Sequence, residues 1–176
     1  MTDLRLRPAR TSDVPGIKDL VAPLAREGIL INKDTVAYYE GIQEFLVVEA
    51  VDDDGSARLA GCGALHVMWE DLGEVRTLAT SDECRGQGVG RMLLAGLLAR
   101  ARAVGVSRVF CLTFEVDFFA RQGFEVMANQ DQIPPDVFAE LLRSHDEGVA
   151  EYLDLARVKP NTLGNTRMIL QLSPED

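Results

Sequence analysis

The alternation of apolar and polar residues along the chain predicts strands and helices that follow one another in an α+β order. Residues 4–7 alternate and indicate a short strand, after which Thr11, Ser12 and Asp13 are typical of a helix N-terminus. This first helix is expected to reach about Arg26. Further strands are expected over residues 45–51, 59–69, 74–80, 107–113, 123–127 and 166–172.

The remaining helices are recognised by their caps and by apolar residues at helical spacing. They are expected over residues 33–43 with a cap at Asn32, over 91–104, over 116–122, and from Pro134 to about 143. Residues 128–160 have a less regular pattern. Because turn residues such as Asp52–Gly55 separate the middle strands, we expect a mixed, largely antiparallel central sheet flanked by helices, within a single domain of residues 1–176.

Composition narrows the class of protein. Of the 176 residues, 47% are hydrophobic and 26% are charged, as in an ordinary soluble domain. No secretion signal or membrane span is evident, so a cytoplasmic location is expected. The net charge of −10 would repel a nucleic acid. Cys62, Cys84 and Cys111 lack the spacing of a zinc site or a disulfide framework, so no metal is expected.

One glycine-rich segment indicates a binding site for an anion. A strand leads into Arg85-x-x-Gly88-x-Gly90 and then into a long helix. Glycines let an anion approach the main chain, where loop amides and the positive end of the helix bind it. The Rossmann and Walker patterns do not fit, because the glycines do not follow the first strand and no Gly-Lys-Ser/Thr is present. The alternative is a tight turn without a ligand.

The segment LATSDECRGQGVGRMLL, which begins at Leu78, resembles the coenzyme A motif of the GNAT acetyltransferases. FFARQGF, which begins at Phe118, resembles their second signature. The resemblance implies a GNAT fold whose sheet is splayed at the acetyl-CoA site. It also implies that the edge of the fourth strand pairs with pantetheine and that the following amides hold the pyrophosphate. The implied acetyl-CoA residues are Leu78, Ala79, Thr80, Arg85, Gly86, Gln87, Gly88, Val89, Gly90 and Arg91.

The likeness extends to the short bacterial N-acetylglutamate synthases. It is carried in collinear order by residues 27–30, 61–65, 73–74, 108–113 and 158–166. It implies transfer of an acetyl group to the α-amine of L-glutamate or a similar amino acid, the first step of arginine biosynthesis. The sequence contains no amino-acid-kinase domain like that of the longer synthases, so their arginine feedback site is not carried over.

A dicarboxylate substrate calls for locally placed cations. The candidate substrate residues are Lys33, Arg76, Lys159, Asn165, Thr166 and Arg167. Glu74 is the candidate proton acceptor, because several members of the superfamily have a carboxylate at the start of this strand. Strand alternation would place Glu74, Arg76 and Leu78 on one face, so a structural Glu74–Arg76 ion pair is the alternative. The oxyanion is assigned to the amide of Leu78 or Ala79.

The identity of the general acid stays open. The commonest general acid of the superfamily is a tyrosine at the position where this chain has Phe119, so a water, the relatively acidic thiol of coenzyme A or another residue such as Tyr152 handles the leaving group, or no acid is needed. His66 and His145 are weaker candidates for the base. Two other functions remain: acetylation of another amino acid, a polyamine or a protein N-terminus, and a non-catalytic acetyl-CoA sensor. The oligomeric state is undetermined, with a homodimer as one alternative.

Overall fold

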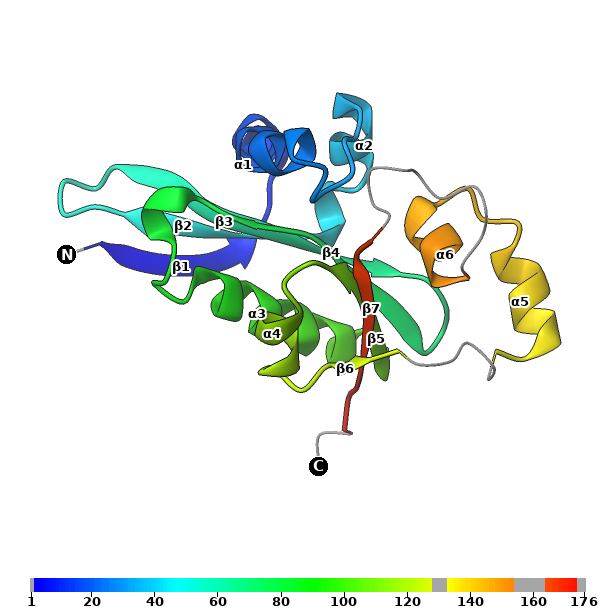
Figure 1. Ribbon diagram of the computed structural model, residues 1–176. Coiled ribbons are helices and arrows are strands. Elements are labelled where there is room, and N and C mark those ends of the chain that lie inside the picture. The colour runs from blue at the N-terminus through cyan, green and yellow to red at the C-terminus, as the bar shows by residue number, and fades with distance from the viewer. Residues whose placement is uncertain (1, 128–132, 154–163, 174–176) are drawn as a thin grey trace.

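A seven-stranded mixed sheet forms the centre of the protein, with helices on both faces (Figure 1). The computed structural model describes residues 2–127, 133–153 and 164–173. The strand order is β1-β2-β3-β4-β5-β7-β6. The strands are β1 (Asp3–Pro8), β2 (Phe45–Val51), β3 (Ala57–Val67), β4 (Leu72–Thr80), β5 (Arg108–Thr113), β6 (Glu125–Val126) and β7 (Thr166–Gln171). The expected α+β class with a mixed, largely antiparallel sheet is confirmed.

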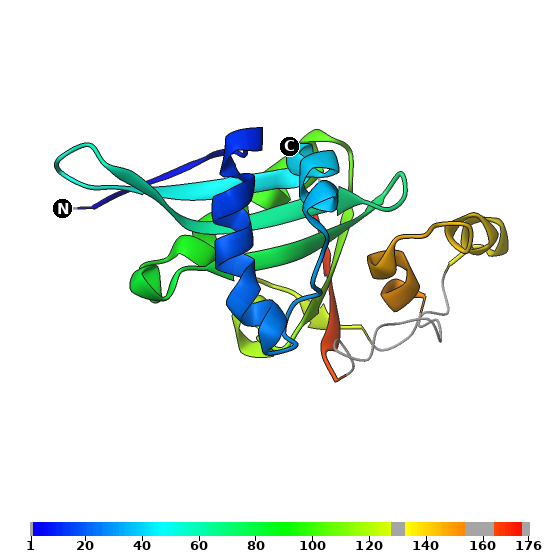
Figure 2. The ribbon, with the colours of Figure 1, turned by 90° about the horizontal axis from the view of Figure 1, so that it is seen from above.

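The helices bury their apolar faces against the two sides of this sheet. Helix α1 (Val14–Arg26) crosses the middle strands on one side together with α2 (Thr35–Glu40), as Figure 2 shows. Helix α3 (Val89–Ala103) and α4 (Val116–Ala120) lie on the opposite side. Two further helices, α5 (Pro135–Leu141) and α6 (Glu147–Tyr152), lie beside the β5–β7 end of the sheet. No helix among the described residues is both long and apolar enough to span a membrane.

The pairing of β4 with β5 is short. The two parallel strands are in register only from Leu72, opposite Arg108, to Glu74, opposite Phe110. Antiparallel pairing with β3 continues along β4 as far as Thr80. Within the described residues, the β5-facing edge of β4 beyond Glu74 therefore has no strand partner, and the sheet is splayed at this place.

A bulge in β4 changes which side chains share a face. Thr77 has a φ of +56°, a conformation that β-branched residues rarely adopt, and the β3–β4 register shifts opposite it. Leu78 consequently faces α3: a Cβ built on Gly63 would lie 2.9 Å from Leu78 Cδ1 and 3.0 Å from Leu97 Cδ1. The prediction that Glu74, Arg76 and Leu78 share one face is wrong for Leu78, because simple alternation does not survive the bulge.

Most predicted elements are present, and the differences are local. The helix expected over residues 33–43 is shorter, because Asp34 and not Asn32 caps α2 and a separate 3-10 turn (Ile42–Glu44) follows Gly41. Helix α6 was not expected. It spans 6 residues, too few to produce a clear apolar period. Strand β6 is also shorter than expected, with 2 residues.

Candidate active site

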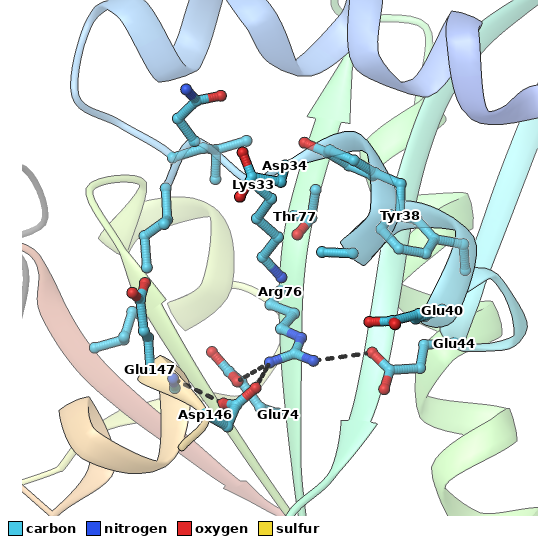
Figure 3. Close-up of a pocket in the computed structure, with 18 of the residues that line it drawn as sticks. Lys33, Asp34, Tyr38, Glu40, Glu44, Glu74, Arg76, Thr77, Asp146 and Glu147 are labelled. Atoms are coloured by element: carbon cyan, nitrogen blue, oxygen red, sulfur yellow. Dashed lines mark hydrogen bonds and ion pairs between the residues drawn. The ribbon is translucent and has the colours of Figure 1, made fainter.

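A cavity of about 520 Å³ opens where β4 leaves β5. Its walls come from the connection between α1 and α2, from α2, from β4, and from the residues that begin α6 and β7. Figure 3 shows that Glu74, Arg76 and Lys33 lie inside it. The cavity thus brings together residues that are far apart in the sequence, including Asn165 beside β7.

Glu74 lies at the base of this cavity and is only 4% exposed. Its Oε2 atom is buried and accepts no hydrogen bond from the described residues. Burial raises the pKa of Glu74 to about 7, and the negative charge of Asp146 contributes in the same direction, while Arg76, Lys33 and His66 lower it. A carboxylate with this pKa can accept a proton near neutral pH.

Arg76 lies among three carboxylates. Its Nη1 donates to Asp146 Oδ2 at 2.8 Å, and its Nη2 donates to Glu44 Oε2 at 3.0 Å. The same Nη1 lies 3.6 Å from Glu74 Oε2. The predicted alternative of a Glu74–Arg76 ion pair is therefore present, although it is longer than the other two contacts. Arg76 acts as the counter-ion that allows three acidic side chains to lie close together.

His66 completes this cluster. Its Nδ1 lies 2.7 Å from Glu44 Oε1, its Nε2 lies 3.7 Å from Asp146 Oδ2, and on the adjacent strand it is the register partner of Glu74. Sequence reasoning identified Glu74, Arg76 and His66 but missed Glu44 and Asp146. For Asp146 a signal was present: Asp is a preferred helix N-cap residue and Glu147 follows it, a pair that would have indicated the start of α6.

The other candidate substrate residues are distributed differently. Lys33 lines the cavity and extends toward Arg76 (Figure 3), and burial followed by the charge of Arg76 lowers its pKa. Asn165 also lines the cavity. Thr166 and Arg167 belong to β7, where they pair with Thr113 and Leu112 of β5, and they are not among the lining residues. Lys159 lies outside the described residues.

The aromatic and histidine candidates also differ in position. His145 lines the cavity, whereas Tyr152 does not. Tyr152 is 1% exposed and packs edge-on against Phe110, with ring centroids 5.1 Å apart, and burial raises its pKa. Phe119 is buried between Phe118 and Phe124. Because Tyr152 lies in the apolar core, this geometry gives no support for its role as general acid.

The glycine-rich segment has the geometry of an anion cradle. Gly86 and Gly88 have φ values of +80° and +85°, and a Cβ built on either would meet nothing within 4 Å. Gly88 is the N-cap of α3, so the first-turn amides of that helix point toward this open space. Arg85 and Arg91 are exposed at its sides, although Arg85 also contacts Asp82 at 3.0 Å.

The cradle and the cavity are connected through one strand. The splayed part of β4 runs from Arg76, in the cavity, to Thr80, whose Cγ2 would lie 3.8 Å from a Cβ on Gly90. An extended ligand with phosphates in the cradle would therefore lie along β4 and reach the cavity with its other end. In the described part of the chain, no three His, Cys, Asp or Glu side chains converge as a metal site.

Comparison with known proteins agrees with this geometry. Residues 22–124 match the Acetyltransferase (GNAT) family. An amino-acid acetyltransferase of Mycobacterium tuberculosis is 51% identical over 167 residues, which cover 95% of this chain and 94% of that protein. The crystal structure of Rv2747 from Mycobacterium tuberculosis in complex with CoA and NLQ has a TM-score of 0.88 and 50% identity, over 96% of this chain and 99% of that one.

A longer structure is also similar. It is the N-acetylglutamate synthase from Neisseria gonorrhoeae complexed with coenzyme A and N-acetyl-glutamate, with a TM-score of 0.74 and 27% identity. The match covers 98% of this chain but 36% of that chain. The present sequence therefore corresponds to about a third of that synthase.

The buried Glu74 predicts a particular dependence of stability on pH. The pKa of Glu74 is about 7 in the folded protein and near 4.5 in the unfolded chain. Between pH 4.5 and pH 7 the folded protein therefore binds a proton that the unfolded chain has lost. The contribution of this group to the free energy of unfolding is therefore present below about pH 4.5 and is lost as the pH rises to 7.

Glu74→Gln removes this titration. We compare the free energies of unfolding of the parent and the variant, measured with urea. The value for the parent minus that for the variant should fall by roughly 1–3 kcal/mol between pH 4.5 and 7.5. Glu70→Gln, which removes an exposed carboxylate from the β3–β4 turn, is the control for the loss of one acidic side chain. If the difference in free energy of unfolding between the parent and Glu74→Gln does not change with pH, the pKa of Glu74 is not raised in the folded protein.

Proposed function

Because the chain belongs to the GNAT acetyltransferase family, we propose that it transfers the acetyl group of acetyl-CoA to the α-amine of L-glutamate. The main support for this proposal is the buried carboxylate of Glu74. It lies in a cavity where β4 separates from β5, and its Oε2 atom accepts no hydrogen bond from the described residues. A substrate amine placed there supplies the missing donor. The similar proteins named amino-acid acetyltransferase and N-acetylglutamate synthase support this choice of substrate class.

Acetyl-CoA is bound as an extended substrate. The amides from Gly86 to Arg91 hold its pyrophosphate, because two left-handed glycines leave that face of the loop open. Its pantetheine amides pair with the free edge of β4 at Leu78, Ala79 and Thr80. This arrangement directs the thioester toward the end of β4 that carries Glu74 and Arg76.

The reaction is a direct acyl transfer in a ternary complex. Glu74 accepts a proton from the ammonium group, and the neutral amine attacks the thioester carbon. The amide of Leu78 or Ala79 holds the oxyanion that forms, at the point where the Thr77 bulge turns the strand. The carbon–sulfur bond then breaks, the nitrogen gives up its second proton to water, and the sulfur leaves as a thiolate. Phe119 cannot protonate this thiolate, so water supplies its proton, or the thiolate leaves without one because the thiol of coenzyme A is relatively acidic.

Lys33 is the cation best placed for a substrate carboxylate. Arg76 already contacts Glu44, Glu74 and Asp146, whereas no described ion pair engages Lys33, which projects into the cavity (Figure 3). Asn165 adds an amide on the cavity wall. Arg76 then acts mainly as a counter-ion, and Thr166, Arg167 and Lys159 remain secondary candidates.

One observation favours a different substrate. Among the described residues that line the cavity, acidic side chains outnumber basic ones: Asp34, Glu40, Glu44, Glu74, Asp146 and Glu147 accompany Lys33, Arg76 and His145. A polyamine or another cationic amine would suit this balance better than a dicarboxylate. The alternative is a GNAT enzyme with the same acetyl-CoA site and a cationic acceptor.

A screen of thiol release from acetyl-CoA tests the proposed function. With the twenty amino acids and several polyamines as acceptors, we expect glutamate to be acetylated with steady turnover, and Glu74→Gln to lower kcat by roughly 10²-fold or more with little change in KM. Preference for a polyamine would support the cationic alternative. Tight binding of acetyl-CoA without release of thiol with any acceptor would instead indicate a sensor.

The cradle is tested by a matched pair of glycine variants. Gly88→Val should abolish the rise in Tm that acetyl-CoA causes, because a side chain at this position would fill the open face of the loop. Gly55→Val is the control: Gly55 has a nearly identical φ of +84° and open surroundings, but it lies in the β2–β3 turn. Both variants place valine at a left-handed φ, so an equal acetyl-CoA-induced rise in Tm in the two would refute the cradle assignment.

The assignment of Lys33 is tested by comparing two lysines. Lys33→Met should raise KM for glutamate by roughly tenfold or more, as expected when a charge-assisted hydrogen bond of about 1.5–3 kcal/mol is lost. The affinity for acetyl-CoA should change little. Lys18→Met, which removes the same charge from α1 and its surface contact with Thr35, should leave both parameters unchanged. If KM does not change in Lys33→Met, the substrate carboxylate binds elsewhere.

A further inference from the structure

Helix α6 covers the carboxylate of Glu74. A Cβ built on Gly148, in the first turn of α6, would lie 2.0 Å from Glu74 Oε2 and 2.7 Å from its Cδ. Only a glycine can occupy that position without moving either α6 or Glu74. The low exposure of Glu74 therefore depends on where α6 lies.

Asp146 joins α6 to the sheet. Its Oδ1 accepts hydrogen bonds from the amides of Gly148 at 2.8 Å and Val149 at 3.2 Å, which caps the helix. Its Oδ2 accepts the hydrogen bond from Arg76 Nη1 at 2.8 Å. One carboxylate thus holds Gly148 over Glu74 and at the same time engages the Arg76 nitrogen that lies 3.6 Å from Glu74 Oε2.

Glu74 and Asp146 both lie near the same nitrogen of Arg76, Nη1. Nη1 is the Arg76 nitrogen nearest to both acids, and the shorter contact goes to Asp146. The second nitrogen, Nη2, is used by Glu44. Glu74 is left with a buried oxygen that accepts no hydrogen bond from the described residues, although Arg76 Nη1 lies 3.6 Å away.

We propose that Asp146 is a positioning residue for Glu74: it holds α6 against the carboxylate and holds Arg76 Nη1 beyond hydrogen-bonding distance of it, so that Glu74 is shielded from water and can accept the proton of the substrate amine. This inference rests on the proposed role of Glu74 as the proton acceptor. It assigns to Asp146 no contact with the reacting atoms.

Removal of the Asp146 charge acts on Glu74 in one direction through three effects. The repulsion between the two carboxylates disappears, Arg76 Nη1 becomes available to Glu74, and a loosened α6 admits water. Each effect favours the ionised carboxylate. The other groups that act on Glu74 are Arg76 on β4, His66 on β3, Lys33 in the connection before α2, and Cys111 on β5. The substitution replaces none of these side chains, but Arg76 and His66 lose the neighbouring Asp146 charge.

Asp146→Asn is the informative variant, because asparagine can still cap α6 while its charge is lost. We expect the acid limb of the pH profile of kcat/KM to move down by roughly one pH unit. The plateau of kcat should fall by roughly threefold, because a weaker base accepts the proton less readily. Gly148→Ala, which displaces α6 without changing any charge, should move the acid limb in the same direction.

A ¹³C titration of the Glu74 carboxyl group in the substrate-free protein, assigned with Glu74→Gln, gives a readout that does not depend on turnover. Its midpoint should fall in both variants. Glu140→Gln is the control: it makes an equal change of charge at an exposed residue of α5 that pairs with Arg143, and it should keep the parent midpoint.

Unchanged Glu74 midpoints in Asp146→Asn and Gly148→Ala would overturn the role of Asp146. Full turnover in Glu74→Gln would instead refute the proposed proton acceptor. The two failures are distinguishable because the carboxyl titration is measured without substrate.

Discussion

The arrangement of the site depends on the point at which the parallel strands β4 and β5 stop pairing. Three register pairs hold them together, ending at Glu74 and Phe110. A strand that has lost its neighbour exposes backbone donors and acceptors, which require another partner. Here the opening contains the cavity on one side and leads to the glycine cradle on the other. A long substrate with amides in its middle and phosphates at one end can satisfy the free strand edge and the cradle together.

The electrostatics of the cavity are determined by the Arg76 guanidinium. It holds the carboxylates of Glu44 and Asp146 at hydrogen-bonding distance, while Glu74 lies farther away. The three acids therefore differ in protonation. The hydrogen bond with His66 and the charge of Arg76 lower the pKa of Glu44 despite its burial, and Arg76 lowers that of Asp146 in the same way, whereas burial raises the pKa of Glu74 to about 7. Unequal pairing of the acids thus leaves Glu74 able to take up a proton near neutral pH beside two ionised carboxylates.

Several features of the site could be predicted from the sequence because they are local. Gly86, Gly88 and the start of α3 form a contiguous segment, and their left-handed backbone and open surroundings agree with the predicted loop. Glu74 and Arg76 are two residues apart on one strand, so their proximity follows from the strand itself. The bulge at Thr77 was not predictable in this way, since it depends on how β3 pairs opposite it, and it reversed the expected orientation of Leu78.

The sequence by itself determined the order of most elements and the anion-binding loop, and by resemblance it indicated the family. Each of these depends on residues that are close together in the sequence. Only the tertiary structure decided which charges meet. Glu44, His66, Arg76 and Asp146 come from four separate segments, and Gly148 contacts Glu74 from a helix that was not expected. The burial of Glu74, and with it its raised pKa, is a property of these long-range contacts. No pattern of nearby residues encodes the desolvation of a side chain by a segment about seventy residues away.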